Sequence, residues 1–299
     1  MQPVVSVIIP THNRANLIKK AVFSVLAQTY QLFEIIIVND ASVDKTPQVL
    51  AFLSQLDERI HIVNNDVALG GGASRNKGIN ISRGKWTAFL DDDDIWHPQK
   101  LEKQLAMLST RPSALACNCF YTIYYPFKIK KMIATPSNIS LDDLLTANVL
   151  GGTSVCMVLT CILKEINGFD PHLRSAQDWD LWIKLRQRGE IVTVTEPLVD
   201  YIVHFNYRIS NNMCAKYIGA RRFYFKYKVL MNEAAKKNNL SFICFIRSRQ
   251  TERSFKKRIH NLTLAIKNTS LRHTLLLALS SLPRILLDKP LRLFAKVRH

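Results

Sequence analysis

Four short, nearly all-apolar runs early in the chain predict strands buried on both faces of a parallel sheet: Val4–Ile9, Glu34–Val38, Ile60–Val63 and Trp86–Leu90. Between them, apolar residues at helical spacing predict helices over 18–26 and over 45–56, the second behind an N-cap at Asp44, and the glycines at 70–72 open a polar helix that continues to about Asn80. Strands that alternate with helices at this spacing indicate βαβ units and a doubly wound sheet. The chain is therefore expected to be an α/β protein.

Beyond these units the pattern predicts a second set of elements. We expect a helix that begins at Pro98 and a strand over Leu115–Tyr125. Ser140 and Asp143 form a capping-box pattern at the start of a further helix. The remaining predicted elements are a strand over Ser154–Leu159, a short helix ended by Gly168, a helix over Asp178–Arg188, and strands over Ile191–Thr195 and Leu198–Val203.

Charge divides the chain into two regions. Residues 1–215 carry 21 Lys and Arg against 20 Asp and Glu, whereas residues 216–299 carry 20 against 3. Nearly all of the net charge of +18 thus lies in the last part of the chain. We expect a nearly neutral domain over 1–215 and a basic, helical region over 216–299, with different partners.

Composition also indicates the cellular compartment in which the chain is expected. No run of eighteen apolar residues exists and the N-terminus begins with a strand pattern, so we expect neither a transmembrane helix nor a secretory signal. The expected compartment is the cytoplasm. The six cysteines form no CxxC pair and have no histidine partners at zinc spacing, so we expect buried, reduced thiols.

A run of four aspartates follows the last of the first four strands, in WTAFLDDDDIWHP (86–98). In open α/β sheets, ligands bind beyond the carboxyl ends of the strands, which is where Asp91–Asp94 fall. Carboxylates packed this closely repel one another unless a cation lies among them. Mg²⁺ or Mn²⁺ binds through one or two carboxylates together with substrate phosphates. The alternative is a solvated acidic loop; an EF-hand is not indicated, because its alternating aspartates, glycine and terminal glutamate are absent.

Two further loops, Thr11–Arg14 and Asn39–Asp44, follow strands of the same sheet and are expected to converge on the aspartates. Asp40 either accepts a hydrogen bond from a nucleotide base or caps a turn. The glycine-rich segment 70–78, which contains Arg75, either cradles a phosphate or is a flexible loop, because it lacks the spacing of the known phosphate-binding motifs.

A carboxylate at Asp178 lies at a predicted helix N-terminus, beside tryptophans at 179 and 182. An aspartate in this position either caps the helix or serves as a general base. The two roles differ in geometry, which the sequence does not give.

Five segments together resemble family 2 glycosyltransferases with the GT-A fold: PTHNRA (10–15), VNDASVDKT (38–46), GGGASRNKGI (70–79), FLDDDDIW (89–96) and QDWDLW (177–182). The resemblance covers residues 3 to about 210. It implies a Rossmann-like, mostly parallel sheet flanked by helices, with a nucleotide-sugar-binding half over 1–97 and an acceptor half over 98–215. It also implies hexosyl transfer with inversion from a nucleotide-diphosphate sugar.

The resemblance assigns donor-binding residues one by one. It implies that Thr11 and Asp40 contact the base or ribose and that Arg75 contacts the nucleotide. Further nucleotide-sugar contacts are expected from Asn13, Arg14, Asp91, Asp92 and His204. His204 lies where relatives often place a lid over the diphosphate, although a lone histidine after a strand is more often structural.

The catalytic residues follow from the same resemblance. Asp91 and Asp93 match the two aspartates of the family's DxD motif, with Asp93 as the direct ligand of Mn²⁺ or Mg²⁺. Asp178 matches the base that deprotonates the acceptor hydroxyl. The chain departs from the family at Gln177, where a glutamate is common, and at His12, where a tyrosine is common.

The basic region mixes Lys and Arg with aromatic residues and ends in leucine-rich stretches broken by Pro283. This pattern suits helices that lie on an anionic membrane surface, and a helical bundle with a solvated basic face is the alternative. We expect no nucleic-acid partner, because no nucleic-acid module is present.

The sequence thus predicts a metal-dependent glycosyltransferase peripheral to the cytoplasmic face of the inner membrane. Its donor is a nucleotide-diphosphate sugar, and its acceptor a glycan or glycolipid, lipid-linked or part of a surface polysaccharide. The alternatives are a sugar nucleotidyltransferase, which more typically carries a long glycine-rich N-terminal phosphate loop, and a catalytically inactive membrane-bound scaffold.

Overall fold

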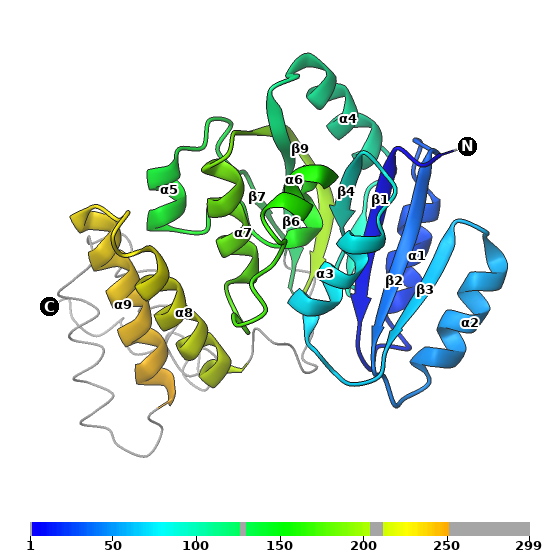
Figure 1. Cartoon of the computed structure of the whole chain (residues 1–299), viewed down its shortest axis with the longest axis horizontal. Helices are drawn as coiled ribbons and strands as arrows, with labels where there is room; N and C mark the ends of the chain where they lie inside the picture. Colours follow the sequence, from blue (N-terminus) through cyan, green and yellow to red (C-terminus); the bar gives the residue numbers. More distant parts are fainter. Residues whose placement is uncertain (1, 126–129, 204–211, 251–299) are drawn as a thin grey trace, which may run out of the picture. The chain divides into compact units, whose positions relative to one another are not determined.

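The computed structural model of the chain describes residues 2–125, 130–203 and 212–250 (Figure 1). The chain divides into two compact units, Met1–Asn211 and Asn212–His299. The first unit contains a single mixed sheet of nine strands with helices on its faces.

The first half of this unit alternates strands with helices. Its strands lie in the order β3-β2-β1-β4, and each neighbouring pair is parallel. The elements are β1 (Val5–Thr11), α1 (Ile18–Leu26), β2 (Phe33–Asp40), α2 (Thr46–Leu56), β3 (Ile60–Asn65), α3 (Gly71–Ile81) and β4 (Trp86–Phe89). The predicted parallel, doubly wound half is confirmed. Since the strand order reverses between β1 and β4, a crevice is expected at the carboxyl ends of these two strands.

The second half extends the sheet in mixed directions. Strand β8 runs antiparallel to both β4 and β6, β9 runs parallel to β6, and β5 and β7 pair antiparallel with β9 and β6. The elements are β5 (Asp94–Trp96), α4 (Lys100–Thr110), β6 (Ala114–Tyr124), β7 (Lys130–Ile133), α5 (Leu141–Thr146), a 3₁₀ turn (Thr153–Val155), β8 (Met157–Leu159), α6 (Thr160–Glu165), α7 (Gln177–Arg186) and β9 (Glu190–Ile202). The mostly parallel α/β sheet flanked by helices is confirmed, with these antiparallel pairs added.

Both faces of the sheet are covered because its strands are apolar on both sides. Val7 and Ile9 of β1 belong to the core that packs against α1, α2 and α4. Ile8, which points the opposite way, lies against Gly78 of α3 on the other face (Figure 1). Helix α3 is thereby held close to β1, which fixes the position of the residues it carries.

Several sequence predictions are corrected by long-range pairing. The two late strands are one strand, β9, because bulges in its pairing with β6 keep Pro197 within it. The predicted strand over Ser154–Leu159 begins as a 3₁₀ turn. Helix α2 has its N-cap at Lys45, although the Asp44 side chain still accepts from the Thr46 N–H at 2.8 Å. The capping box at Ser140 is confirmed.

The cysteines are only partly as expected. All six are free thiols, and those at 117, 119 and 156 are buried as predicted. Cys161 and Cys214 are exposed and Cys244 is half-buried, so the prediction of burial is wrong for these three. Cys161 lies in α6 and Cys214 in the second unit, where the helices present one face to solvent.

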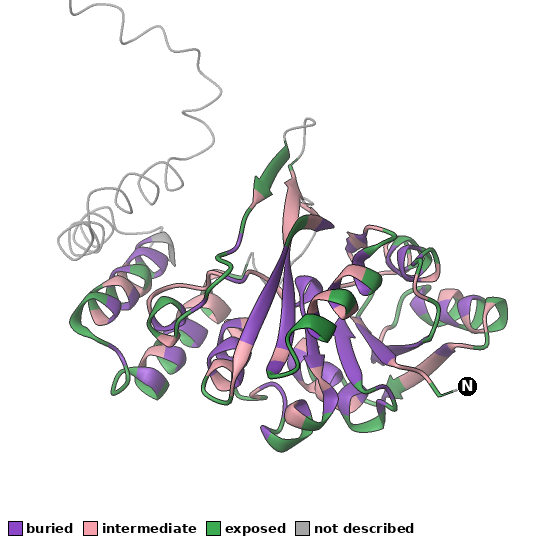
Figure 2. Ribbon diagram, turned by 90° about the horizontal axis from the view of Figure 1, so that it is seen from above, coloured by how far each residue is buried: buried purple, intermediate pink, exposed green. Residues whose placement is uncertain are grey.

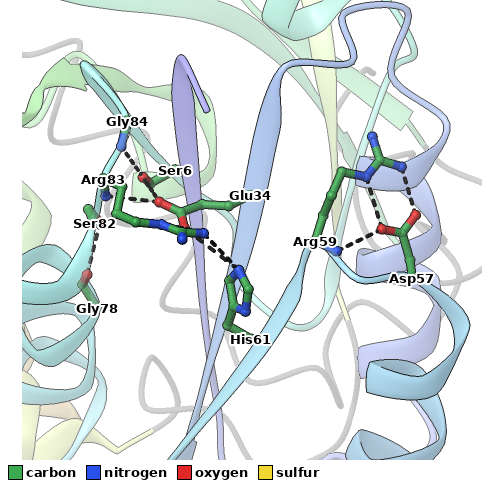
Figure 3. A network of polar contacts seen from close by, with 9 residues as sticks. All are labelled: Ser6, Glu34, Asp57, Arg59, His61, Gly78, Ser82, Arg83 and Gly84. Atoms are coloured by element: carbon green, nitrogen blue, oxygen red, sulfur yellow. Dashed lines mark hydrogen bonds and ion pairs between the residues drawn. The ribbon is translucent and has the colours of Figure 1, made fainter. Parts of the chain in front are cut away.

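The buried carboxylate of Glu34 links neighbouring strands at the amino-terminal ends of β1 and β2 (Figure 3). The Ser6 hydroxyl donates to Glu34 at 2.6 Å, and Arg83 donates to both carboxylate oxygens of Glu34 from its backbone and guanidinium nitrogens. Burial alone would raise the pKa of Glu34, but these hydrogen bonds outweigh it and hold the pKa below 4.5. The network joins β1, β2 and the loop that leads into β4.

The second unit is helical over its described residues. Helix α8 (Met213–Tyr227) begins at Asn212, whose side chain caps the Ala215 N–H at 3.0 Å, and is followed by α9 (Glu233–Gln250). Ala220 of α8 packs on Phe245 and Ile246 of α9. Phe225 and Val229 are 56% and 85% exposed. Among the described residues, none of the helices has the length and apolar character needed to cross a membrane.

Candidate active site

The acidic turn lies at the carboxyl ends of β1 and β4, where the sheet topology places it. Thr11 ends β1, and its hydroxyl donates to Asp92 Oδ2 at 2.7 Å. The loop after β1 and the turn after β4 are thus joined directly. The predicted convergence of these two loops is found in the structure.

Asp92 titrates unusually. Burial, together with the charges of Asp93 and Asp91, raises the pKa of Asp92 from 3.8 to about 7, although the Thr11 hydrogen bond and the Arg14 charge act in the opposite direction. Asp92 is therefore partly protonated near neutral pH, mainly because of desolvation by burial and in part because two carboxylates lie next to it. Such a cluster has the electrostatic character of a cation site.

The donor set of the turn fits Mg²⁺ or Mn²⁺ only when other ligands are added. Among the described residues, no group of three or more His, Cys, Asp or Glu side chains is arranged to hold a metal ion. Mg²⁺ commonly keeps waters and uses one or two carboxylates together with substrate phosphates. The turn supplies hard oxygen ligands in that number and leaves the remaining positions to solvent and substrate.

Arg75 of α3 connects the turn to a second acidic group. Its guanidinium pairs with Asp91, which also accepts from the Thr153 hydroxyl at 3.2 Å. The arginine lies over the Phe169 ring at 5.4 Å, and its charge reaches Asp178. Its Nε is buried and has no hydrogen-bond partner among the described residues. An oriented cation with an unsatisfied donor is suited to an anionic ligand.

Asp94 belongs to a different environment from the other three aspartates. It begins β5, is buried, and accepts from the Ser154 hydroxyl at 2.6 Å. It also lines a cavity of about 300 Å³, together with Asp178, Asn148, Gly151, Tyr121 and Tyr201. The acidic run is therefore not a solvated loop: Asp91 and Asp92 bond Arg75 and Thr11 at the carboxyl ends of the strands, and Asp94 lines this cavity.

Asp178 faces this cavity and does not cap its helix. The N-cap of α7 is Ala176, which has a φ of 62° and no side-chain cap. Asn148 Nδ2 donates to Asp178 Oδ2 at 2.9 Å, and Asn148 Oδ1 accepts from the Gly151 N–H at 3.1 Å. Burial raises the pKa of Asp178, while the Arg75 charge and the Asn148 hydrogen bond partly oppose it. A half-buried carboxylate with a raised pKa beside a cavity is a candidate general base.

Asp40 and Asn13 organise the neighbouring loops. Asp40 accepts from the N–H groups of Leu69 and Gly70, both at 2.8 Å, and from Asn65 at 2.7 Å. Burial alone would raise the pKa of Asp40, but these bonds lower it. Asn13 Oδ1 accepts from the Val43 N–H at 2.8 Å. Both side chains make the turn-stabilising contacts that are the alternative to a direct ligand contact.

For the remaining predicted site residues, the structure gives few contacts that bear on their proposed roles. The Arg14 N–H donates to the Thr46 hydroxyl at 2.9 Å, and the Arg14 charge acts on Asp92. Asp93 lies in the turn between Asp92 and Asp94. His204 lies outside the described residues.

Three functional candidates were not singled out by sequence reasoning: Asn148, Tyr121 and Thr153. They lie in segments without a recognisable motif, and their partners are Asp178, the cavity and Asp91. Only Tyr121 carried a usable sequence signal, because it lies two residues before Ile123 in a predicted strand and the two side chains therefore share a face. In the structure both line the cavity.

Comparisons with known proteins agree with this arrangement. A family model described as glycosyl transferase family 2 matches residues 6–163. A Bacillus subtilis (strain 168) protein, named as teichuronic acid biosynthesis glycosyltransferase TuaG, is 32% identical over 230 residues, which are 76% of this chain and 88% of that protein. The Escherichia coli glucosyltransferase WfgD is 30% identical over 191 residues, 64% of this chain and 72% of its own.

Solved structures show the same fold. The crystal structure of S. aureus TarS 1-349 in complex with UDP-GlcNAc aligns with a TM-score of 0.67 at 18% sequence identity, over 91% of this chain and 82% of that one. The likeness at this identity concerns the fold, which is GT-A. Together with the family match over more than half of the chain, it leads to one conclusion: the chain is a glycosyltransferase and belongs to glycosyl transferase family 2.

Proposed function

We propose that the chain is a metal-dependent, inverting glycosyltransferase that moves a sugar from a nucleotide-diphosphate donor to a hydroxyl group of a lipid-linked or surface-polysaccharide acceptor. The observation that carries the proposal is the position of Arg75. Its guanidinium pairs with Asp91 of the acidic turn, and its charge acts on Asp178 in the cavity. One cation thus connects a donor-side carboxylate cluster with an acceptor-side base.

The donor nucleotide is assigned to the carboxyl ends of β1 and β4, where the strand order of the sheet reverses. Thr11, Asp40 and Arg14 lie on the loops that border these strand ends, and Asn13 holds two of those loops together. Arg75 has an unsatisfied buried Nε that a diphosphate oxygen would satisfy. Asp91, Asp92 and, outside the described residues, His204 complete the proposed donor contacts.

Asp93 is the proposed ligand of Mn²⁺ or Mg²⁺, with the diphosphate and water completing the coordination. When bound, the cation neutralises the leaving diphosphate. The raised pKa of Asp92 is consistent with the assignment, since burial, the larger cause, and the charges of Asp93 and Asp91 all disfavour its ionisation and a cation would offset them.

Asp178 is the proposed general base. A carboxylate whose pKa is raised by burial accepts a proton more readily at neutral pH than an exposed one does. Asn148 donates a hydrogen bond that orients the carboxylate. The acceptor hydroxyl then attacks the anomeric carbon from the face opposite the diphosphate. One base without a covalent nucleophile gives inversion, by the logic that separates the glycoside hydrolase classes.

The named relatives support these donor and acceptor classes. WfgD is named for transfer from UDP-Glc to α-D-GlcNAc-diphosphoundecaprenol, and TuaG for teichuronic acid biosynthesis. TarS was solved with UDP-GlcNAc, and a mannosyltransferase from Pyrobaculum calidifontis with GDP-Man and Mn²⁺. We therefore assign a nucleotide-diphosphate sugar as donor and a glycan or glycolipid as acceptor.

Residues 216–299 are proposed to hold the enzyme peripherally on the cytoplasmic face of the inner membrane. Within the described part of this region, Phe225 of α8 is exposed and lies beside Arg221 and Lys228, whose charged groups are 5.9 and 5.1 Å from its ring. Basic groups beside exposed apolar side chains suit an anionic leaflet. Sedimentation with vesicles should show binding to anionic but not to neutral lipid, and binding that weakens with salt. Equal binding to both would contradict this assignment.

Donor hydrolysis tests the central proposal. The purified chain with Mn²⁺ is offered a panel of UDP-, GDP- and dTDP-sugars, and release of the nucleotide diphosphate is measured. Asp93→Ala and Asp178→Asn should abolish the activity, whereas Glu58→Gln, an exposed acidic residue remote in sequence from both, should leave it unchanged. Hydrolysis that survives Asp93→Ala would refute the assigned site. No activity with any donor in the unaltered chain would favour the inactive scaffold.

A further inference from the structure

The β6–β7 hairpin extends one wall of the cavity. Tyr121 and Ile123 of β6 line the cavity, as do Val199 and Tyr201, which lie opposite them on β9. Side chains directly opposite one another in neighbouring strands project from the same face of a sheet. These four residues therefore identify the cavity face of this part of the sheet.

On its other edge, β6 pairs with β7, and the register continues the same face. Ile123 is opposite Lys131, and Tyr124 is opposite Lys130. Lys131 thus projects from the cavity face beside Ile123, whereas Lys130 projects from the reverse face. Both lysines are exposed, and Figure 2 shows β7 as mostly exposed next to the half-buried end of β6.

Lys131 adds a positive charge near a cavity that is lined by carboxylates and aromatic rings. The cross-strand spacing puts its Cβ about 5 Å from that of Ile123, and its four-carbon stem is long enough for the ammonium group to reach the rim of the cavity. Two carboxylates, Asp94 and Asp178, lie inside, and the tyrosine rings at 121 and 201 form apolar walls with polar tips. The cavity is suited to a neutral sugar ring, and its rim to an anionic neighbour of that ring.

We propose that Lys131 binds an anionic oxygen group, a phosphate or a carboxylate, on the acceptor next to the sugar whose hydroxyl Asp178 deprotonates. The inference rests on the proposed function and adds a selectivity to it. A charged acceptor is held by the cavity and by the lysine, and an uncharged acceptor only by the cavity. Lys131 is then a specificity residue for acceptors that carry this group.

Matched probe pairs test the inference by equilibrium binding to the full chain in the presence of UDP and Mn²⁺. One pair is propyl α-GlcNAc and propyl GlcNAc-α-diphosphate; the other is propyl glucoside and propyl glucuronide. The measured quantity is the ratio of dissociation constants within each pair. Lys131→Ala should weaken binding of the charged member about three- to tenfold and leave the uncharged member unchanged. Lys131→Arg should restore the ratio, and Lys130→Ala should not alter it.

Each outcome decides the inference. A loss confined to the diphosphate pair identifies a phosphate-bearing acceptor, and a loss in the glucuronide pair identifies a carboxylate. An unchanged ratio in both pairs overturns the inference, as does the absence of binding of either charged probe to the unaltered chain. Donor hydrolysis by the unaltered chain is measured in parallel. If it is present while the ratios are unchanged, only the inference fails, whereas its absence counts against the proposed function.

Discussion

Asn148 offers the sharpest test of how the cavity sets the protonation of Asp178. Its amide donates to the Asp178 carboxylate at 2.9 Å, a bond that stabilises the charged form of the acid. Asn148→Ala removes the bond and therefore raises the pKa of Asp178 further. Because the proposed base acts when deprotonated, the acidic limb of the kcat/KM profile should move to higher pH.

The magnitude follows from the environment of the bond. Hydrogen bonds to charged groups contribute about 1.5–3 kcal/mol, and the lower end applies here because Asp178 borders an open cavity. About 1.4 kcal/mol is a tenfold change in the proton-binding equilibrium, so the limb should move by about one pH unit. Asn148→Asp should move it in the same direction for a second reason, since a like charge beside Asp178 also disfavours ionisation.

The assay is kcat/KM against pH for the unaltered chain, both Asn148 variants and Asn138→Ala. Asn138 is an exposed asparagine in the loop before α5 and serves as the matched control. Asn148 also bonds Gly151, so the unfolding midpoint of each variant is measured first. Asn148→Asp keeps the acceptor for the Gly151 N–H and separates the two effects. An acidic limb that stays in place in both folded variants would refute the role of Asp178 as the titrating base.

Two further predictions concern stability. A Cβ added at Gly78 would lie 2.7 Å from Cγ2 of the fully buried Ile8. Overpacking costs about 1–3 kcal/mol and the helix-propensity gain is about 1 kcal/mol, so Gly78→Ala should lower the free energy of unfolding, measured with urea, by up to about 2 kcal/mol. Gly152→Ala, where nothing lies within 4 Å, should leave it nearly unchanged, and equal effects of the two would contradict the packing argument. Glu34→Gln should destabilise the chain at pH 7, and progressively less as the pH falls below 4.5. The reason is that the lowered pKa of Glu34 stabilises the fold only while the carboxylate is charged. A difference in unfolding free energy between variant and unaltered chain that does not depend on pH would show that the charge is unimportant.

The sequence predicted those elements of the fold whose residues, within one short segment, determine whether they form a strand or a helix. The runs that became β1 to β4 are apolar and bounded by turns, and parallel order follows from their alternation with helices. The strands that were missed, β5 and β7, are three and four residues long and exist through their partners. Asp94–Trp96 pairs with Val199–Tyr201, about a hundred residues away, which no local pattern contains.

The residues of the candidate site also fall into those that a local sequence pattern identifies and those that only long-range contacts identify. The acidic turn and Asp178 were visible because their residue types and order resemble a family. Asn148 was not, because its importance lies in one contact with a residue thirty positions later. Asp40 shows what the sequence leaves open: a carboxylate after a buried strand either contacts the nucleotide or stabilises a turn. The structure adds its bonds to the Leu69 and Gly70 N–H groups, and its contact with the nucleotide stays a proposal. Only the folded loops distinguish these uses of the same residue type.

The most direct test of the central claim is thermal unfolding of the full chain with nucleoside diphosphates, with and without Mn²⁺. A ligand that binds only the folded state raises the unfolding midpoint. If the acidic turn holds a cation against a diphosphate, one nucleoside diphosphate should raise the midpoint only when Mn²⁺ is present, and Asp93→Ala should remove the increase. An increase of the same size without metal, or in Asp93→Ala, would contradict the account.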